Sequence, residues 1–154
     1  MVGAYGIHFN PAEPAPETRL VPVMRAYAAV EAWLRHVSDL DLMRRILPFI
    51  DPWPAPLVRD LLDPRARELT LADGLELYLS HVRSRNYGLD LLPLFRHLDP
   101  VRVDRRLGDE HGIGARPTYH FRLPECRLDE PGWSLMPEWS KWLLVESVAA
   151  VPAL

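Results

Sequence analysis

The sequence predicts an α+β fold, in which an antiparallel sheet carries its helices on one face. Two segments far apart in the chain, 2–10 and 117–123, alternate apolar and polar residues as half-buried strands do. The longer segments between and after them repeat apolar residues at helical spacing. We find no internal repeat and no interdomain linker, so we expect a single domain over residues 1–154.

Composition limits the classes of partner. With 48% hydrophobic and 25% charged residues, the 154-residue chain is long enough and apolar enough to bury a substantial core. A net charge of −3 gives no bulk attraction to nucleic acid or to anionic membranes, so we expect neither as a partner. Cys126 is the only cysteine, and no leader or membrane-spanning run is evident, which favours the cytoplasm.

The first predicted strand, 2–10, directs Tyr5, Ile7 and Phe9 to one side, and His8 and Asn10 to the other. A proline-rich loop follows it.

An amphipathic helix is predicted over 20–37, with Arg25, Glu31 and Arg35 pointing away from its apolar face. A bend at Asn86 and Gly88 precedes an apolar run, 89–95, that predicts a strand. Further helices are predicted as a short turn within 40–56 and at 57–62, 71–82 and 137–150.

The second predicted strand, 117–123, places His120 and Arg122 opposite its apolar residues. If the apolar sides of both strands pack under the helices, then His8, Asn10, His120 and Arg122 line one sheet surface. Neighbouring strands lie about 5 Å apart, so these groups can converge on a nucleotide polyphosphate and its divalent ion. The alternative is a solvated face, with Arg122 in a surface ion pair with the acids Glu125, Asp129 and Glu130.

Three further sets of residues are candidates. Arg85 and Asn86 lie at a turn, where they either bind a substrate carboxylate or phosphate or stabilise the loop. Asp90 is either a pocket acid or a helix cap. Arg44 and Arg45 form either a substrate clamp or a solvated pair.

Four stretches carry a resemblance to a known family: "YGIHFNP", "MRAYAAVEAWLR", "RNYGLDLLPLF" and "YHFRLPECRLDEPGW". In this order they resemble the amidoligases, bacterial relatives of the carboxylate–amine ligases built on the glutamine-synthetase catalytic fold. The similarity covers roughly residues 3–150. It implies that ATP phosphorylates a small-molecule or peptide carboxylate, and that an amine then attacks the acyl phosphate. It also implies that Mg²⁺ or Mn²⁺ holds the phosphates over the open face of a sheet.

The resemblance also implies roles for individual residues. "GIHFN" is similar to a Gly-x-His-x-His strand, with His8 at the first histidine and Asn10 at the second. "HFRLP" is similar to Glu-x-Arg-x-Pro, with Arg122 as the arginine that faces the phosphates and His120 in the place of the metal-binding glutamate. We therefore expect His8 and His120 at the metal, and expect the nucleotide to contact His8, Asn10, Arg122, Arg85 and Asn86. Arg122 and Glu125 are the expected catalytic residues, Glu125 by orienting Arg122 or by accepting a proton from the amine.

Two departures from the family pattern matter. Imidazole at position 120 suits magnesium less well than carboxylate does. The paired glutamates of a "G-x-E-x-E" strand are also missing, so the chain resembles the C-terminal portion of an amidoligase domain with an incomplete sheet. If so, we expect it to associate with the missing N-terminal portion or to form a homo-oligomer. The rival hypotheses are a non-catalytic domain that binds a partner or completes another chain's sheet, and a different nucleotide-using enzyme.

Overall fold

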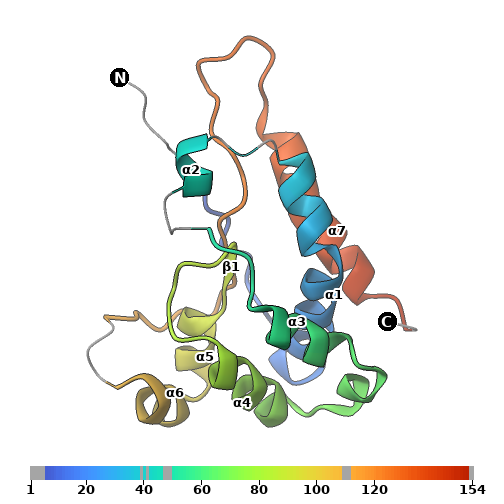
Figure 1. Cartoon of the computed structure of the whole chain (residues 1–154), viewed down its shortest axis with the longest axis vertical. Helices are drawn as coiled ribbons and strands as arrows, with labels where there is room; N and C mark the ends of the chain where they lie inside the picture. The colour runs from blue at the N-terminus through green and yellow to red at the C-terminus, as the bar shows by residue number, and fades with distance from the viewer. Residues whose placement is uncertain (1–5, 39, 41, 47–49, 109–111, 153–154) are drawn as a thin grey trace.

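We analysed a computed structural model, which describes residues 6–38, 40, 42–46, 50–108 and 112–152, without the side chains of Met43 and Arg45. The fold is α+β, mostly helical, with a small two-stranded antiparallel sheet (Figure 1). The helices are α1 (Pro16–Val37), α2 (Leu42–Ile46), α3 (Ala55–Leu62), the 3₁₀ helix η1 (Pro64–Glu68), α4 (Leu71–His81), α5 (Leu92–Leu98), α6 (Pro100–Leu107) and α7 (Leu135–Ala149).

The two predicted histidine strands lie side by side, although little of either forms regular strand. β1 (Leu89–Asp90) pairs antiparallel with β2 (His120–Phe121), with Asp90 opposite His120. Isolated antiparallel bridges join segment 6–12 to segment 118–125, at Gly6–Glu125, Phe9–Phe121 and Ala12–Thr118. Segment 118–125 is therefore flanked by β1 on one side and by segment 6–12 on the other. Residues 2–5 of the first predicted strand lie outside the described residues.

The apolar side of segment 118–125 packs against the long helices. Tyr119, Phe121 and Leu123 are fully buried. The Phe121 ring lies 5.5 Å from Trp142 of α7 and 6.4 Å from Tyr27 of α1, centroid to centroid. α1 and α7 lie against each other along one side of the molecule (Figure 1). Helices thus cover the apolar side, and the histidines remain on the opposite side.

α1 begins at Pro16, earlier than predicted, because the fixed φ of proline suits the first turn of a helix. Arg25 and Glu31 were predicted to point away from the core, yet both are buried. Arg25 Nη1 donates to the carbonyl oxygen of Leu61 at 2.5 Å, at the end of α3. The Glu31 carboxylate accepts from the Trp53 backbone N–H at 3.0 Å. α1 therefore has a second covered side, where main-chain groups bind these two charged side chains.

The prediction of a strand over 89–95 is wrong beyond Asp90, because helix α5 occupies the rest of the apolar run. The Asp90 carboxylate accepts the backbone N–H of Leu92 at 3.1 Å, which favours a helical turn directly after β1. α6 was not predicted, although Asp99 caps it by accepting the Arg102 N–H at 2.9 Å. The short turn within 40–56 and the helices predicted at 57–62, 71–82 and 137–150 are confirmed within a few residues, as α2, α3, α4 and α7.

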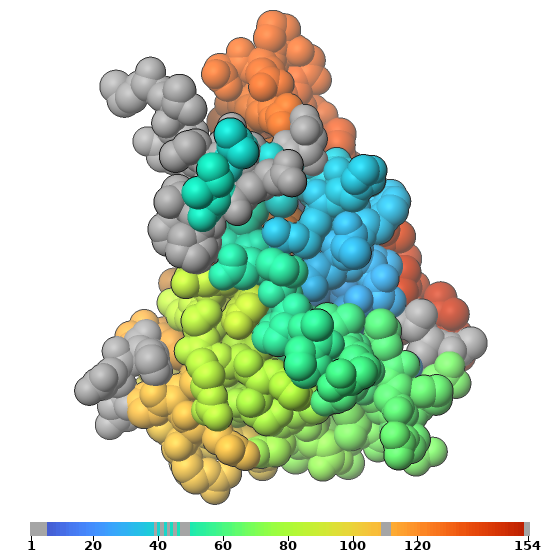
Figure 2. Space-filling view, in the orientation of Figure 1, coloured from blue at the N-terminus to red at the C-terminus, as the bar shows by residue number. Residues whose placement is uncertain are grey.

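Segment 126–134, between segment 118–125 and α7, protrudes at one end of the molecule, away from α4, α5 and α6 (Figure 2). Within the described part of the chain, no helix combines the length and the apolar composition needed to cross a bilayer.

Candidate functional site

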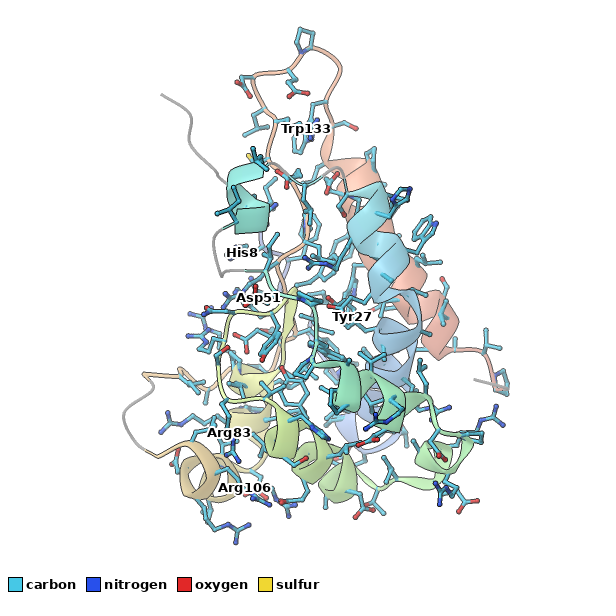
Figure 3. All side chains as sticks on the ribbon, in the orientation of Figure 1. His8, Tyr27, Asp51, Arg83, Arg106 and Trp133 are labelled. Carbon is cyan, nitrogen blue, oxygen red and sulfur yellow. The ribbon has the colours of Figure 1, made fainter. Side chains whose placement is uncertain are left out.

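The sheet surface opposite the core brings three of the predicted residues into contact. The ring of His8 lies edge-on to that of His120, with 4.9 Å between centroids. His120 Nδ1 lies 2.7 Å from Asn10 Oδ1, and the His8 side chain lies on the same part of the molecule as α2 (Figure 3). The bridge between Phe9 and Phe121 explains this arrangement, since it places the residues that flank Phe9 beside those that flank Phe121.

Arg122 lies on the same surface and binds a carboxylate that comes from β1. Its Nη2 is 3.1 Å from Asp90 Oδ2, and the same oxygen accepts from Arg85 Nε at 3.0 Å. The alternative interpretation of the sequence paired Arg122 with the acids that follow it. Asp90 is the partner instead, because the register of β1 and β2 brings residue 90 next to the strand of Arg122. We call His8, Asn10, Arg85, Asp90, His120 and Arg122 the polar face.

Burial and the neighbouring arginines keep the histidines of the polar face neutral. Burial and the positive charge of Arg122 lower the pKa of His120 to about 3. Burial, followed by the charges of Arg122 and Arg44, also lowers the pKa of His8. Since Asn10 Oδ1 can only accept, His120 donates from Nδ1, and its Nε2 carries a lone pair at neutral pH.

The polar face is suited to an anion. Arg85 and Arg122 carry two positive charges against the single carboxylate of Asp90, so the three groups together carry a net +1. Arg122 Nε is buried and has no hydrogen-bond partner among the described residues. An unsatisfied guanidinium donor in a cationic, half-buried setting favours phosphate or carboxylate.

The same residues do not fit a magnesium ion held directly by the protein. Mg²⁺ prefers oxygen ligands, whereas His8 and His120 offer nitrogen. The carboxylate of Asp90 is already bound by two arginines. Among the described residues, no group of three or more His, Cys, Asp or Glu side chains could hold a metal ion.

Glu125 contacts Arg44 and helix α7. Its carboxylate is buried and accepts from Arg44 Nη1 at 2.7 Å, and its backbone N–H donates to Glu138 at 3.0 Å. Arg44 Nη1 and Nη2 also donate to the carbonyl oxygens of Pro124 and Arg122, at 2.9 and 2.5 Å. Arg44, a candidate substrate clamp, therefore lies in a buried structural contact. The carboxylate of Glu125 binds Arg44, whereas the carboxylate of Asp90 binds Arg122.

The main-chain groups of Asn86 take part in the loop. Its carbonyl oxygen accepts from the Asp51 N–H at 2.6 Å, and its own N–H donates to Ser84 Oγ at 3.3 Å. These bonds support the parallel bridge between Asp51 and Tyr87, which holds the loop that carries Arg85. The contacts match the alternative in which Asn86 stabilises a loop, while Arg85 reaches the polar face.

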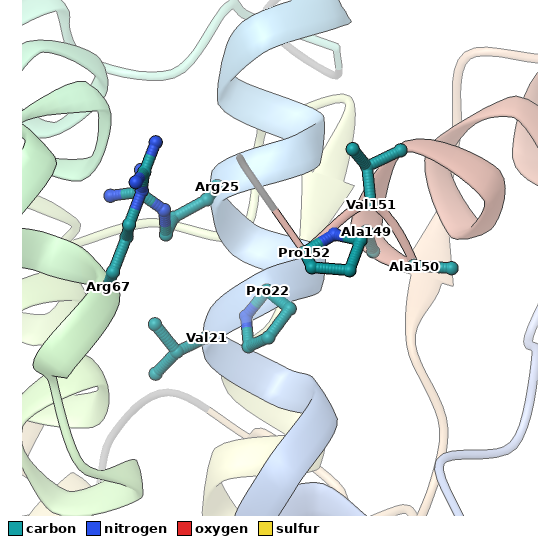
Figure 4. A pocket seen from close by; sticks show the side chains of 8 residues that line it. All are labelled: Val21, Pro22, Arg25, Arg67, Ala149, Ala150, Val151 and Pro152. Atoms are coloured by element: carbon teal, nitrogen blue, oxygen red, sulfur yellow. The ribbon is translucent and has the colours of Figure 1, made fainter.

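A pocket of about 190 Å³ lies elsewhere, between α1, η1 and the end of α7 (Figure 4). Arg25 and Arg67 reach it, among apolar side chains such as Val21, Pro22 and Val151. Arg25 already holds the end of α3 through the carbonyl oxygens of Leu61 and Asp63. None of the polar-face residues lines this pocket. The candidate site is therefore located by the chemistry of its side chains and not by the size of a cavity.

Comparison with known proteins identifies a family. Residues 3–144 match the family model described as "Putative amidoligase enzyme". Neither a curated protein nor a solved structure matches the chain. The matched region contains every residue of the polar face and spans most of the chain. The chain therefore belongs to the amidoligase family.

Proposed function

We propose that this chain carries the phosphate-binding face of an ATP-dependent carboxylate–amine ligase that acts in the cytoplasm. The observation that carries the proposal is the position of Arg122, which lies half-buried beside two neutral histidines and has a buried, unpaired Nε. Membership of the amidoligase family supports a ligase, and the polar face supplies the donors that a transferred phosphoryl group needs. The open sheet of the glutamine-synthetase fold is the architecture that this proposal implies.

In the proposed reaction, a carboxylate oxygen of one substrate attacks the γ-phosphorus of ATP, and ADP leaves. The nitrogen of an amine then attacks the acyl carbon of the acyl phosphate. Inorganic phosphate leaves, the nitrogen loses a proton, and an amide remains. Arg122 and Arg85 bind the phosphoryl oxygens, on which negative charge is concentrated. Asn10 fixes the ring of His120, so that Nε2 accepts a hydrogen bond from the nucleotide or from the amine.

Hydroxylamine provides a direct test, because it replaces the amine and converts an acyl phosphate to a hydroxamate, which gives a coloured complex with ferric ion. The full chain, given ATP, Mg²⁺, hydroxylamine and a panel of amino acids, short peptides and dicarboxylates, is expected to form hydroxamate and ADP in equal amounts with one class of acid. ADP without hydroxamate would indicate a different nucleotide-using enzyme. If neither hydroxamate nor ADP forms with any acid, the proposal is contradicted.

A second candidate function is favoured by the free edge of segment 6–12. Within the described residues, the backbone N–H groups of His8 and Asn10 have no hydrogen-bond partner, whereas those of Ile7 and Phe9 bond to segment 118–125. Such an edge pairs readily with a strand of another chain. A domain that completes another sheet in this way needs no catalysis of its own.

Sedimentation tests the second candidate. If the edge pairs two copies, the wild-type chain sediments as a dimer. Ala12→Pro, at an exposed position in line with His8 and Asn10, then shifts it to monomer by removing an outward N–H donor. A wild-type chain that stays monomeric at all concentrations would exclude pairing between copies at this edge.

A further inference from the structure

Asp90 uses both of its carboxylate oxygens, each for a different purpose. The side chain is fully buried at the end of β1. Oδ1 accepts the backbone N–H of Leu92 at 3.1 Å, which fixes the carboxylate to the first turn of α5. Oδ2 accepts from Arg85 Nε at 3.0 Å and from Arg122 Nη2 at 3.1 Å. The main-chain bond orients the carboxylate, and the other oxygen holds two arginines.

These two arginines come from different parts of the chain. Arg85 lies in the loop before β1, and Arg122 lies just after β2. A guanidinium has five N–H donors, and each arginine uses one of them on Asp90. Within the described residues, neither guanidinium group has another hydrogen-bond partner. Their side chains are 34% and 12% exposed, so a ligand can reach the pair from the Arg85 side.

We propose that Asp90 is a positioning residue that holds Arg85 and Arg122 together as a two-arginine clamp for a phosphoryl group. The identity of the ligand rests on the proposed function. A single buried carboxylate attracts both guanidinium groups, but it neutralises only one of their two positive charges, so the cluster keeps a net positive charge. A bound phosphate supplies the remaining negative charge and takes up free N–H donors of both arginines.

Two other roles for Asp90 fit the contacts less well. A general base needs an oxygen that substrate can reach, whereas Asp90 is completely buried and both of its oxygens accept hydrogen bonds. A cap of α5 alone needs only the bond from Leu92 to Oδ1. The clamp explains why the second oxygen, Oδ2, binds both Arg85 and Arg122.

The test is a double-mutant cycle on the binding of inorganic pyrophosphate, measured by calorimetry on the full chain without added metal ion. Asp90→Asn keeps the shape of the side chain and removes its charge. It is expected to weaken binding about tenfold or more, as is Arg122→Gln, because each removes charge-assisted hydrogen bonding. If Asp90 acts through the two arginines, the loss in the double variant is smaller than the product of the two single losses, because only Arg85 is then left for Asp90 to hold. Asp60→Asn, which changes the same charge at an exposed helical position, is expected to bind as the wild type does.

Asp90→Asn removes a buried countercharge and can fail to fold, in which case Arg85→Gln decides. Arg85 is more exposed, and its loss leaves the Asp90–Arg122 pair in place. A folded Arg85→Gln variant with about tenfold weaker pyrophosphate binding supports the clamp. Any of three results would overturn the clamp. The first is wild-type affinity in Arg85→Gln or in a folded Asp90→Asn protein. The second is a pair of losses that multiply in the double variant, and the third is a wild-type chain that does not bind pyrophosphate. Hydroxamate formation by the wild type is scored separately, so the ligase and the clamp can fail independently.

Discussion

Arg122→Ala is expected to lower kcat/KM for ATP-dependent hydroxamate formation by about a thousandfold. The physical reason is that charge develops on the transferred phosphoryl group, and Arg122 is the most buried cation of the polar face. Inside a partly desolvated site such a cation acts with little screening by water. Asp90 keeps Arg85 as a partner in this variant, so the fold survives with a loss of about 1–3 kcal/mol in the free energy of unfolding.

Two further variants separate the charge of Arg122 from its shape. Arg122→Lys keeps the charge but loses the planar fork, and an activity between those of the wild type and the alanine variant is expected. Arg59→Ala removes the same charge from an exposed side chain of α3 and is expected to leave kcat/KM unchanged. Steady-state kinetics with urea unfolding of each variant makes the comparison. Near-wild-type activity in a folded Arg122→Ala protein would remove Arg122 from the proposed mechanism.

The orientation of four residues of the polar face follows from the local sequence pattern alone. Successive side chains of an extended segment point to opposite sides, so apolar residues at 7, 9, 119, 121 and 123 determine where His8, Asn10, His120 and Arg122 point. That the two segments are neighbours could be expected because each has one apolar side that needs the same core. The structure confirms their convergence, with the rings of His8 and His120 in contact.

The partners of the charged residues could not be predicted in the same way. Arg122 pairs with Asp90, which is 32 positions earlier, and Arg44 pairs with Glu125, which is 81 positions later. Such pairs depend on the register between segments, and an alternating pattern leaves register open to any shift by an even number of residues. The prediction therefore gave Arg122 the acids nearest in sequence, whereas β-pairing supplied a more distant one.

Helix α5 illustrates a different limit. The apolar run 89–95 is compatible with a buried strand or a buried helix, because a run that is apolar on all sides shows no period. The decision depends on Asp90, whose side chain accepts the Leu92 N–H, and on Pro93, which is acceptable in the first turn of a helix and unfavourable inside a sheet. Both signals were present in the sequence, but they carry less weight than a long apolar run.

The second large effect is expected for stability, from Arg44→Met. The guanidinium of Arg44 is 6% exposed and binds the Glu125 carboxylate together with the carbonyl oxygens of Arg122 and Pro124. Methionine fills most of the volume but donates no hydrogen bond. Removing one partner from a buried ion pair typically costs about 3–5 kcal/mol, so we expect a loss of this size in the free energy of unfolding measured with urea.

The charge-removing double variant Arg44→Met/Glu125→Gln is expected to recover part of that loss, because it no longer leaves a carboxylate buried without this cation. A loss below about 1 kcal/mol in Arg44→Met would mean that the pair contributes no more than a surface ion pair does.

Arg44→Met is also expected to affect the polar face, because Arg44 contacts both segments that form it. A Cβ atom on Gly6 would lie 2.5 Å from Arg44 Nη2, so the guanidinium packs directly against segment 6–12 while its donors hold residues 122–125. Arg44 thus fixes the two segments that carry His8 and Arg122 to each other. A folded Arg44→Met protein is therefore expected to bind pyrophosphate more weakly than the wild type, although Arg44 belongs to none of the proposed ligand contacts. Unchanged pyrophosphate affinity would show that the backbone bridges between the two segments hold the polar face without Arg44.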